Sequence, residues 1–415
     1  MHIAFFTNFY LPVVNGVVRS VESFRQELTR QGNNVFVFAQ EDDGYQDEEP
    51  FIFRYPSLSL PIQVDIPAVI PVSTFVNKLF PSLKPDVIHT HHPILLGQAA
   101  AKKAEELNLP LVFTFHTQYR EYTHYFPLPQ DAIQDFLRGR IETWLKDFMR
   151  KCQHIVLPSK SMKEILVRDY GLQDRFTVIP TGIDLEPYDN ADGDALRARM
   201  GWTDNRVLIS TGRLEKEKNW PVLLQAAQRA MEKYHDLRVI IIGDGTEKNE
   251  LEKLAQELGI AEWVTFTGQL PFNEVTLHLK AADVFGFASV TETQGLVTME
   301  AMAAGLPVVA VNASGTRDIL ENGEQGYLVP NDPDALAQSL IQLLDSPENM
   351  KRFGANALIR AETFDVKKCA VQLMDVYKQA REDKKHNQFV NIKDEKEEVQ
   401  YAKTNGSERY ARTAA

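Results

Sequence analysis

Short apolar runs alternate with longer segments of helical periodicity along the first half of the chain. Apolar runs occupy residues 3–7, 35–39 and 85–90, while residues 17–30 and 95–107 repeat their apolar positions at helical spacing. Continuous apolar runs of this length are typical of strands buried on both faces. Their alternation with helices predicts a parallel sheet covered on both sides by helices.

The same alternation restarts in the second half, after a stretch at 184–193 that is rich in Asp, Asn and Pro. We therefore predict an α/β protein with two Rossmann-like domains, and an amphipathic helix after them. Charge is dense and apolar residues are sparse near the end of the chain, which predicts a disordered tail. The predicted ranges are 1–187, 188–366, 367–381 for the helix and 382–415 for the charged tail.

Residues 291–305, TETQGLVTMEAMAAG, connect two predicted strands of the second domain. Strong helix formers precede Gly305, so we predict a helix at 296–304 that begins near Gln294 and Gly295. Its free backbone N–H groups would lie at the carboxyl end of a strand, where open α/β sheets bind phosphorylated ligands. Glu292 precedes this anion site and Glu300 lies within the helix, so their carboxylates could reach two ends of one ligand.

Arg213 and Lys218 follow another strand of the second domain, predicted at 206–211. A guanidinium and an ammonium group suit a diphosphate. Composition alone favours a solvated charged turn, but the position beside the predicted anion site favours the diphosphate. Glu292 and Glu300 lie too close together on one short segment for a glycosidase pair, because such carboxylates usually flank the scissile bond from different elements.

Histidines cluster at the ends of two strands of the first domain. His116 ends the strand at 109–115, where a structural and a catalytic role are both open. His89, His91 and His92 invite a metal interpretation, yet Pro93 follows at once and no Asp or Cys lies at ligand spacing. We predict no metal site.

Composition restricts the partners and the compartment. The chain of 415 residues has a formal net charge of −12, which argues against nucleic-acid binding, since a duplex binder needs a basic surface. Its two cysteines have no metal-binding spacing and fit a reducing cytosolic compartment. No run of about 18 apolar residues occurs, so we expect a soluble or peripherally membrane-bound protein.

Two segments of the first domain have two interpretations each. Residues 131–151 form an amphipathic pattern with a basic excess, which fits either a core helix with a solvated face or a helix on an anionic membrane surface. Residues 56–71 combine four prolines with Leu, Ile and Val, which excludes regular structure. They fit either a packed loop or a lip facing an acceptor.

Taken together, these residues resemble the family 4 glycosyltransferases, which are retaining enzymes of the GT-B type that use sugar nucleotides. The resemblance covers about residues 1–380 and implies two facing Rossmann-like domains with a deep inter-domain cleft. It also implies a helix near 367–381 that crosses back to the first domain. The residues that carry it are Glu292 with Glu300, Arg213 with Lys218, His116 in Phe-His-Thr, residues 86–90 and the turn at 180–184.

The resemblance implies a role for each matching residue. Arg213 and Lys218 would bind the diphosphate, Glu300 the ribose, and the backbone at Gln294, Gly295 and Leu296 the sugar and phosphate. Glu292 would hold the transferred sugar, which His116 would contact from the first domain. Gly16 would let the N-terminal loop approach the donor, although many relatives have two or three glycines there.

A narrower resemblance, in residues 115–125, 217–219 and 292–295, is to the branch that glycosylates diacylglycerol. It implies a UDP-sugar donor such as UDP-glucose, a lipid acceptor, and peripheral attachment at the cytoplasmic face of the membrane. A soluble or polysaccharide-precursor acceptor is the alternative. A sugar-nucleotide-binding protein without catalysis is disfavoured, because all four predicted catalytic residues are present: His116, Arg213, Lys218 and Glu292.

Overall fold

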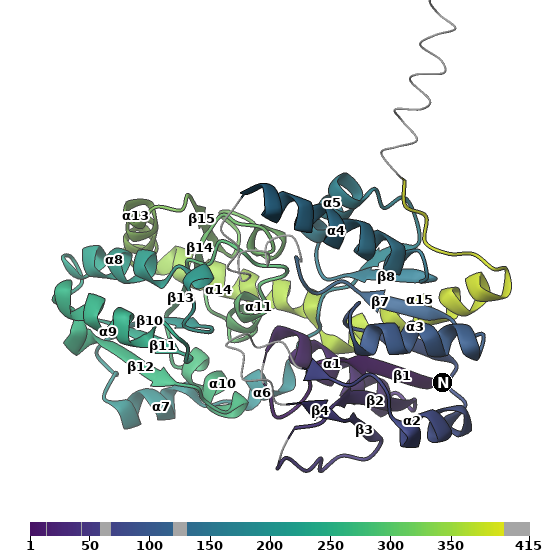
Figure 1. Ribbon diagram of the computed structural model, residues 1–415. Coiled ribbons are helices and arrows are strands. Elements are labelled where there is room, and N and C mark those ends of the chain that lie inside the picture. Colours follow the sequence, from purple (N-terminus) through teal and green to yellow (C-terminus); the bar gives the residue numbers. More distant parts are fainter. Residues whose placement is uncertain (14, 43, 59–67, 119–130, 394–415) are drawn as a thin grey trace, which may run out of the picture. The chain divides into compact units, whose positions relative to one another are not determined.

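The computed structural model describes residues 1–393 apart from residues 14, 43, 59–67 and 119–130, and it describes only the backbone of residues 131–138. The described chain forms two compact units (Figure 1). One unit consists of Met1–Ile179 and the chain from Ala370 on, and the other is Pro180–Cys369. The second unit is therefore one continuous stretch, whereas the first is built from two segments that are far apart in sequence.

A seven-stranded parallel sheet forms the centre of the first unit, in the order β3-β2-β1-β6-β7-β8-β9. Apolar side chains of alternate strand residues pack under α2 to α5 in one core. The strands are β1 (His2–Thr7), β2 (Asn34–Gln40), β3 (Ile52–Tyr55), β6 (Val87–Thr90), β7 (Leu111–Thr114), β8 (His154–Leu157) and β9 (Phe176–Val178). The helices are α1 (Gly16–Arg30), α2 (Thr74–Leu79), η1 (Phe80–Leu83), α3 (Leu96–Glu106), α4 (Asp131–Met149) and α5 (Lys160–Tyr170).

The second unit has a six-stranded parallel sheet in the order β12-β11-β10-β13-β14-β15. Neighbouring residues of one strand enter separate cores on its two faces, as Leu208 and Ile209 do in β10. The strands are β10 (Arg206–Thr211), β11 (Leu237–Ile242), β12 (Val264–Gly268), β13 (Val284–Phe287), β14 (Val308–Val311) and β15 (Gly326–Val329). The helices are α6 (Glu186–Asn190), α7 (Gly193–Met200), η3 (Lys216–Lys218), α8 (Trp220–Met231), α9 (Lys248–Glu257), η4 (Ala261–Trp263), α10 (Phe272–Lys280), α11 (Leu296–Ala303), α12 (Thr316–Ile319), α13 (Pro333–Leu344), α14 (Pro347–Ala361) and η5 (Glu362–Phe364).

Both sheets reverse their strand order at one point, between β1 and β6 in the first unit and between β10 and β13 in the second. Open α/β sheets bind ligands at such points, because the loops after the two strands diverge and leave room between them. The alternation of strands and helices predicted from the sequence is confirmed, as is the α/β fold class with two Rossmann-like sheets.

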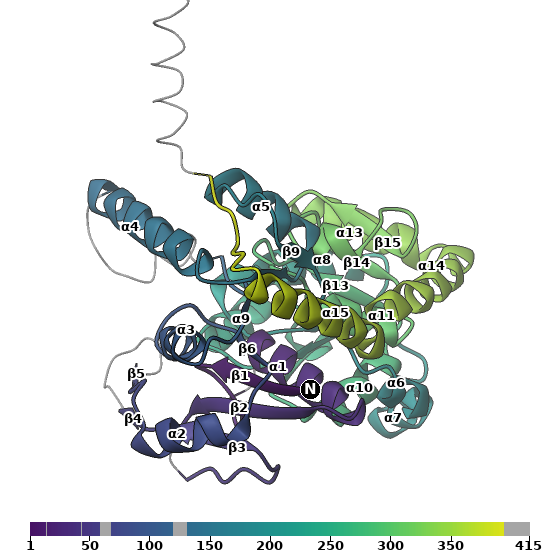
Figure 2. The same cartoon turned by 90° about the vertical axis from the view of Figure 1, so that its right-hand side faces the viewer.

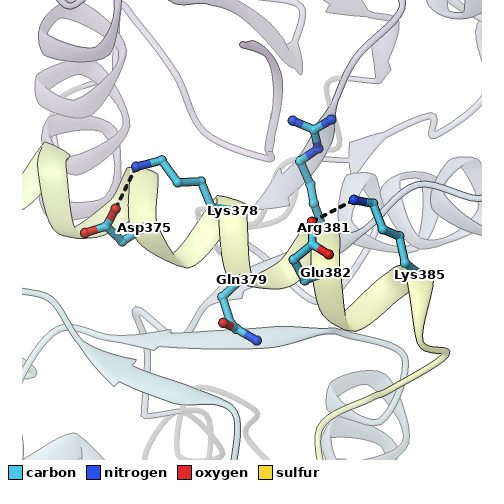
Figure 3. A pocket seen from close by; sticks show the side chains of 6 residues that line it. All are labelled: Asp375, Lys378, Gln379, Arg381, Glu382 and Lys385. Carbon is cyan, nitrogen blue, oxygen red and sulfur yellow. Dashed lines mark hydrogen bonds and ion pairs between the residues drawn. The ribbon is translucent and has the colours of Figure 1, made fainter.

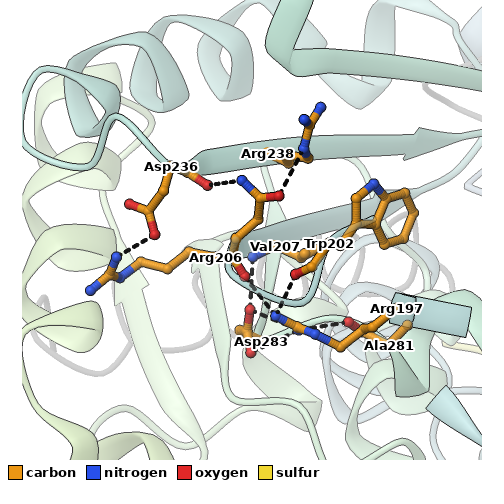
Figure 4. A network of polar contacts seen from close by, with 9 residues as sticks. Arg197, Trp202, Arg206, Val207, Asp236, Arg238, Ala281 and Asp283 are labelled. Atoms are coloured by element: carbon orange, nitrogen blue, oxygen red, sulfur yellow. Dashed lines mark hydrogen bonds and ion pairs between the residues drawn. The ribbon is translucent and has the colours of Figure 1, made fainter. Parts of the chain in front are cut away.

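A polar network lies at the amino ends of the strands of the second sheet (Figure 4). Arg197 on α7 donates to the carbonyl oxygens of Ala281, Trp202 and Asn205 and to both carboxylate oxygens of Asp283. Asp283 in turn accepts a hydrogen bond of 2.8 Å from the backbone of Val207, at the start of β10. One guanidinium therefore connects α7 to the beginnings of two neighbouring strands.

The chain enters and leaves the second unit through two adjacent segments. Ile183 forms a parallel bridge with Asp365, and its backbone exchanges hydrogen bonds of 2.9 Å with Phe364 and Val366. A Cβ atom on Gly182 would lie 2.3 Å from the Cα of Val366, so no larger residue fits there. The two crossings are hydrogen-bonded to each other.

The last described residues correct the predicted tail, which begins too early. Helix α15 (Val366–Lys385) continues past residue 381, and Val390 and Ile392 are buried in the core of the first unit. The backbone of Val390 donates to Cys152, and Ile392 forms a bridge with Leu172. Val390 and Ile392 are two positions apart, so both face the core from one side of an extended segment and keep it ordered despite its charged neighbours. Residues 394–415 lie outside the described residues.

The predicted proline-rich loop also differs in part. Its ends form the two-stranded antiparallel β4 (Ser57–Leu58) and β5 (Ala68–Val69), although the prediction excluded regular structure. Pro56 and Pro71 lie outside this pairing, and the carbonyl of Pro56 accepts from Ile70 at 2.8 Å. Pro56 and Pro71 therefore remove no donor that this pairing needs, while residues 59–67 lie outside the described residues.

Candidate active site

The loop between β13 and α11 lies at the point where the second sheet reverses its strand order. Gly295 precedes the first residue of α11 with a φ of +83°, a left-handed conformation that favours glycine. The segment after β14 fixes this loop: Thr291 forms a parallel bridge with Ser314, and the Ser314 hydroxyl donates to the Glu292 carbonyl at 3.2 Å. The N-terminus of α11 therefore lies at the carboxyl edge of the sheet, as predicted.

The loop after β10 supplies the two predicted cations. Arg213 is the more exposed and forms an ion pair of 2.9 Å with Glu217. Its carbonyl accepts a hydrogen bond from the indole of Trp220 at 2.9 Å, which ties this loop to α8. Lys218 ends the short helix η3, and Asn219 follows in a left-handed conformation.

Lys218 and Glu292 meet at the centre of this region. The Lys218 ammonium lies 2.5 Å from a carboxylate oxygen of Glu292, and that oxygen also accepts from the Ser289 hydroxyl at 2.7 Å. Both side chains are largely shielded, with 17% and 12% of their surfaces exposed. The structure thus brings together Lys218, the predicted diphosphate-binding residue, and Glu292, the predicted sugar-binding residue. They come from the loops after two neighbouring strands.

Gln294 contributes its side chain as well as the predicted backbone. The amide oxygen accepts from the Thr181 backbone N–H at 2.9 Å, and the amide nitrogen donates to the Thr181 carbonyl at 3.2 Å. This two-point contact ties the loop to the turn at the start of the second unit. Gln294 and Thr181 are 113 residues apart in sequence, so no local pattern announces their contact.

Glu300 lies in the second turn of α11 and is buried, with 1% of its surface exposed. Leu296 is the first residue of the same helix. Seven of the predicted residues belong to the loops and helix that follow two adjacent strands: Arg213, Lys218, Glu292, Gln294, Gly295, Leu296 and Glu300. The ribose role of Glu300 and the backbone role at Leu296 stay predictions.

His116 and Gly16 lie in the first unit. His116 follows β7, and its Nε2 is 2.9 Å from Nδ1 of His91. Burial lowers the pKa of His116 to about 3, so the imidazole is neutral at physiological pH. Gly16 is the first residue of α1, which Asn15 caps, and a Cβ atom there would meet nothing within 4 Å.

The other histidines of this region, His89 within β6 and His92 after it, are buried and hydrogen-bonded. His89 contacts the Tyr377 hydroxyl and the Thr114 hydroxyl, each at 2.7 Å, and His92 accepts from the Asn8 backbone at 3.1 Å. Within the part of the chain that the structure describes, no group of three His, Cys, Asp or Glu residues is arranged to hold a metal ion.

A hollow along α15 does not have the character of an anion site (Figure 3). Its cations are paired with carboxylates: Lys378 lies 2.8 Å from Asp375, and Lys385 lies 2.7 Å from Glu382. Arg381 lies 3.4 Å from Asp86. Because these exposed pairs largely neutralise one another, the hollow has little net charge to attract a phosphate.

Comparison with known proteins agrees with this geometry. Residues 14–187 match the family "Glycosyltransferase Family 4", and residues 193–360 match "Glycosyl transferases group 1". The chain is 31% identical over 380 residues to the alpha-monoglucosyldiacylglycerol synthase of Acholeplasma laidlawii, an alignment that covers 88% of this chain and 93% of the relative. The chain belongs to glycosyltransferase family 4. It is a sugar-transferring enzyme.

Other relatives of this glycosyltransferase support the assignment. The alpha-monoglucosyldiacylglycerol synthase of Streptococcus pneumoniae is also 31% identical, over 84% of this chain and 79% of the relative. Among solved structures, sucrose-phosphate synthase from Thermosynechococcus elongatus matches with a TM-score of 0.76 at 23% identity, over 91% of this chain and 98% of that one. Anabaena HepE in complex with UDP matches with a TM-score of 0.73 at 20% identity, over 91% and 100%. These structures share the fold.

Proposed function

We propose that this glycosyltransferase moves a hexose, glucose, from UDP-glucose to a lipid acceptor such as diacylglycerol, with retention of configuration. The observation that supports it most is the Lys218, Glu292 and Ser289 cluster beside the N-terminus of α11. A helix N-terminus and a shielded cation favour a diphosphate, while a carboxylate next to them can accept hydrogen bonds from sugar hydroxyls.

Each residue has a defined part in this proposal. Lys218 and Arg213 neutralise the charge that develops on the diphosphate as the glycosidic bond breaks. Glu292 orients the transferred sugar, Glu300 holds the ribose, and the backbone from Gln294 to Leu296 binds the sugar and phosphate. His116 contacts the sugar from the domain at 1–187, which we propose binds the acceptor, while the domain at 188–366 binds the donor.

A transfer assay tests the donor and the cation roles. Purified enzyme is incubated with labelled UDP-glucose, UDP-galactose or GDP-mannose and with vesicles containing diacylglycerol, and labelled lipid is counted. We expect labelling from UDP-glucose, and a loss of about 10²–10³ in rate for Lys218→Ala by analogy with the loss of one oxyanion donor. Lys216→Ala is the matched control, because Lys216 is exposed on the same short helix. Equal rates for the two variants would refute the diphosphate role.

A soluble acceptor is the second candidate. D-inositol 3-phosphate glycosyltransferase of Xylanimonas cellulosilytica is 33% identical over 308 residues, covering 71% of this chain and 72% of the relative. Adding inositol phosphate in place of the vesicles distinguishes the two acceptors, since labelled product then stays in the aqueous phase.

We propose that the enzyme attaches peripherally to the cytoplasmic face of the membrane through the N-terminal part of α4. The described helices include none long and apolar enough to cross a membrane. Towards its C-terminal end α4 is a core helix, with Leu145, Phe148 and Met149 buried, and Lys146 is paired with Glu142 at 2.9 Å. Its N-terminal part extends past α3 and α5 (Figure 2), and Arg140 there is exposed.

Vesicle co-sedimentation tests this attachment. Arg138→Glu with Arg140→Glu should reduce recovery with anionic vesicles, because each basic residue near the surface contributes about 1 kcal/mol. Arg150→Glu with Lys151→Glu, at the other end of the helix, is the matched control. Equal recovery of both double variants would contradict the proposed contact.

A further inference from the structure

His91 and His116 form a buried imidazole pair on one face of the first sheet. His91 follows β6 and His116 follows β7, which are neighbouring parallel strands. The two ring centroids are 5.2 Å apart with an interplanar angle of 25°, and Nδ1 of His91 lies 2.9 Å from Nε2 of His116. His91 is 1% exposed and His116 is 9% exposed.

This contact restricts where the protons lie. A neutral imidazole carries one proton, on either Nδ1 or Nε2, so a hydrogen bond between two neutral rings uses the proton of only one of them. Burial holds the pKa of both rings far below the ordinary value, which keeps both neutral at physiological pH. If His91 donates, His116 keeps its own proton on Nδ1; if His116 donates, its Nδ1 is bare.

The second nitrogen of His91 distinguishes the two arrangements. Nε2 of His91 is buried and has no hydrogen-bond partner among the described residues. If His116 donated, this nitrogen would have to carry a proton without an acceptor, and orphaned buried N–H groups are rarer than unsatisfied acceptors. A bare Nε2 on His91 places its proton on Nδ1, directed at His116.

We propose that His91 is a positioning residue that donates through Nδ1 to His116 and thereby holds His116 in the tautomer with its proton on Nδ1. His116 then offers an N–H donor to an oxygen of the transferred sugar. The sugar contact rests on the proposed function, whereas the tautomer rests on the pair itself. The contact with His91 uses Nε2 of His116, so Nδ1 is the nitrogen left to donate to a sugar. Unlike Nε2 of His91, Nδ1 of His116 does not belong to the buried polar atoms that lack a partner, so a proton there is not orphaned.

A rigid surrounding keeps His91 in place. His89 packs against it at a tilt of 33°, with ring centroids 4.4 Å apart, and is itself fixed at both nitrogens by Tyr377 of α15 and Thr114 of β7. Phe5 of β1 packs edge-on against both rings, at 5.3 and 5.1 Å. The ring of His91 therefore cannot turn away from His116 without displacing well-packed neighbours.

The test compares His91→Phe, which keeps a ring but loses the donor, with His91→Asn, whose amide nitrogen can replace Nδ1. His154→Phe is the matched control, because His154 is buried in the same unit and bonds to Thr177, away from this pair. We expect His91→Phe to lower kcat about 10- to 100-fold with little change in KM for the donor, by analogy with partners that orient a catalytic group. His91→Asn should retain most of the activity, and His154→Phe nearly all of it.

Nitrogen NMR of labelled histidine reads the tautomer directly. In the wild type, His116 should be protonated on Nδ1, and His91→Phe should shift the proton toward Nε2. Protonation on Nε2 in the wild type, or an unchanged tautomer in His91→Phe, would overturn the proposal, as would equal losses of kcat in His91→Phe and His154→Phe. A fully active His116→Ala would instead remove the sugar contact from the proposed function, and the NMR result would still decide the tautomer.

Discussion

Lys218 and Glu292 have to be considered as one unit, because each is the ion-pair partner of the other and both are largely shielded from water. A cation that is already paired with a carboxylate neutralises less of an incoming diphosphate than a lone cation does. The carboxylate, in return, holds the ammonium in one position beside α11. For the proposed diphosphate role, the pair offers less positive charge than a lone lysine but holds the ammonium group in a fixed position. A fixed position favours stabilisation of charge that develops only in the transition state.

A double-mutant cycle separates stability from turnover in this pair. Lys218→Met should lower the free energy of unfolding by about 1 kcal/mol, because it leaves the Glu292 carboxylate shielded without its counter-charge. Adding Glu292→Gln should restore stability but not activity. Urea unfolding and the transfer rate are the two measurements; recovery of turnover in the double variant would show that neither charge serves the reaction.

The buried histidines make stability depend on pH. The pKa of His92 in the folded state is about 3, below its ordinary value of 6.5, because burial disfavours the charged ring. The unfolded chain therefore binds more protons below pH 6.5, so stability is complete above that pH and is lost as the pH falls toward 3.

This dependence is measurable in urea unfolding between pH 4 and pH 8. Each such histidine contributes about 1.4 kcal/mol per pH unit within the window. His92→Asn should reduce the slope of the unfolding free energy against pH by about 1.4 kcal/mol per pH unit, which corresponds to one proton fewer taken up on unfolding. An unchanged slope would mean that His92 takes up no proton on unfolding.

At the scale of elements, the position of the site follows from strand order. The loops after β10 and β13 are neighbours only because the sheet grows outward in both directions from these two strands. Their side chains lie at the carboxyl ends of the strands, while the network around Arg197 holds the amino ends of β10 and β13.

Arg197 should therefore matter for stability and not for chemistry. Arg197→Met removes hydrogen bonds to three carbonyls and one carboxylate, and should lower the free energy of unfolding by about 3 kcal/mol. Arg199→Met on the same helix is the control, because Arg199 is 65% exposed and lies 3.8 Å from Glu274. Thermal unfolding of the two variants should differ clearly, and the KM for the donor should not change in either.

At the scale of the whole molecule, the core of the first unit includes side chains from the segment that follows α15. Val390→Ala with Ile392→Ala should destabilise it by about 2 to 4 kcal/mol, because both side chains are buried in its core. Val371→Ala on α15 is the control, since Val371 is 54% exposed. Equal melting temperatures for the two proteins would contradict the packing of residues 386–393.

The fold was largely predictable because strands buried on both faces must be continuous apolar runs, as in 206–211, where the predicted and observed strands coincide. The site was predictable as far as strand ends and the start of α11 define it. The contacts of Lys218 with Glu292 and of Gln294 with Thr181 were not, because they join residues 74 and 113 positions apart. The buried segment at 386–393 was not predicted, because its two apolar core residues are too few to stand out from the charged residues around them.

The paired crossings at Ile183 and Asp365 have a consequence for how such enzymes diversify. The first and last segments of the second unit are hydrogen-bonded to each other. We therefore expect that an exchange of this unit between related genes keeps the pairing only if both segments come from the same parent. A chimaera made with one crossover would pair an entry segment from one parent with an exit segment from another, against the close approach at Gly182. Paired recombination at residues 180 and 369 would instead move the complete second sheet, with the loops that follow its strands, into another protein of the family.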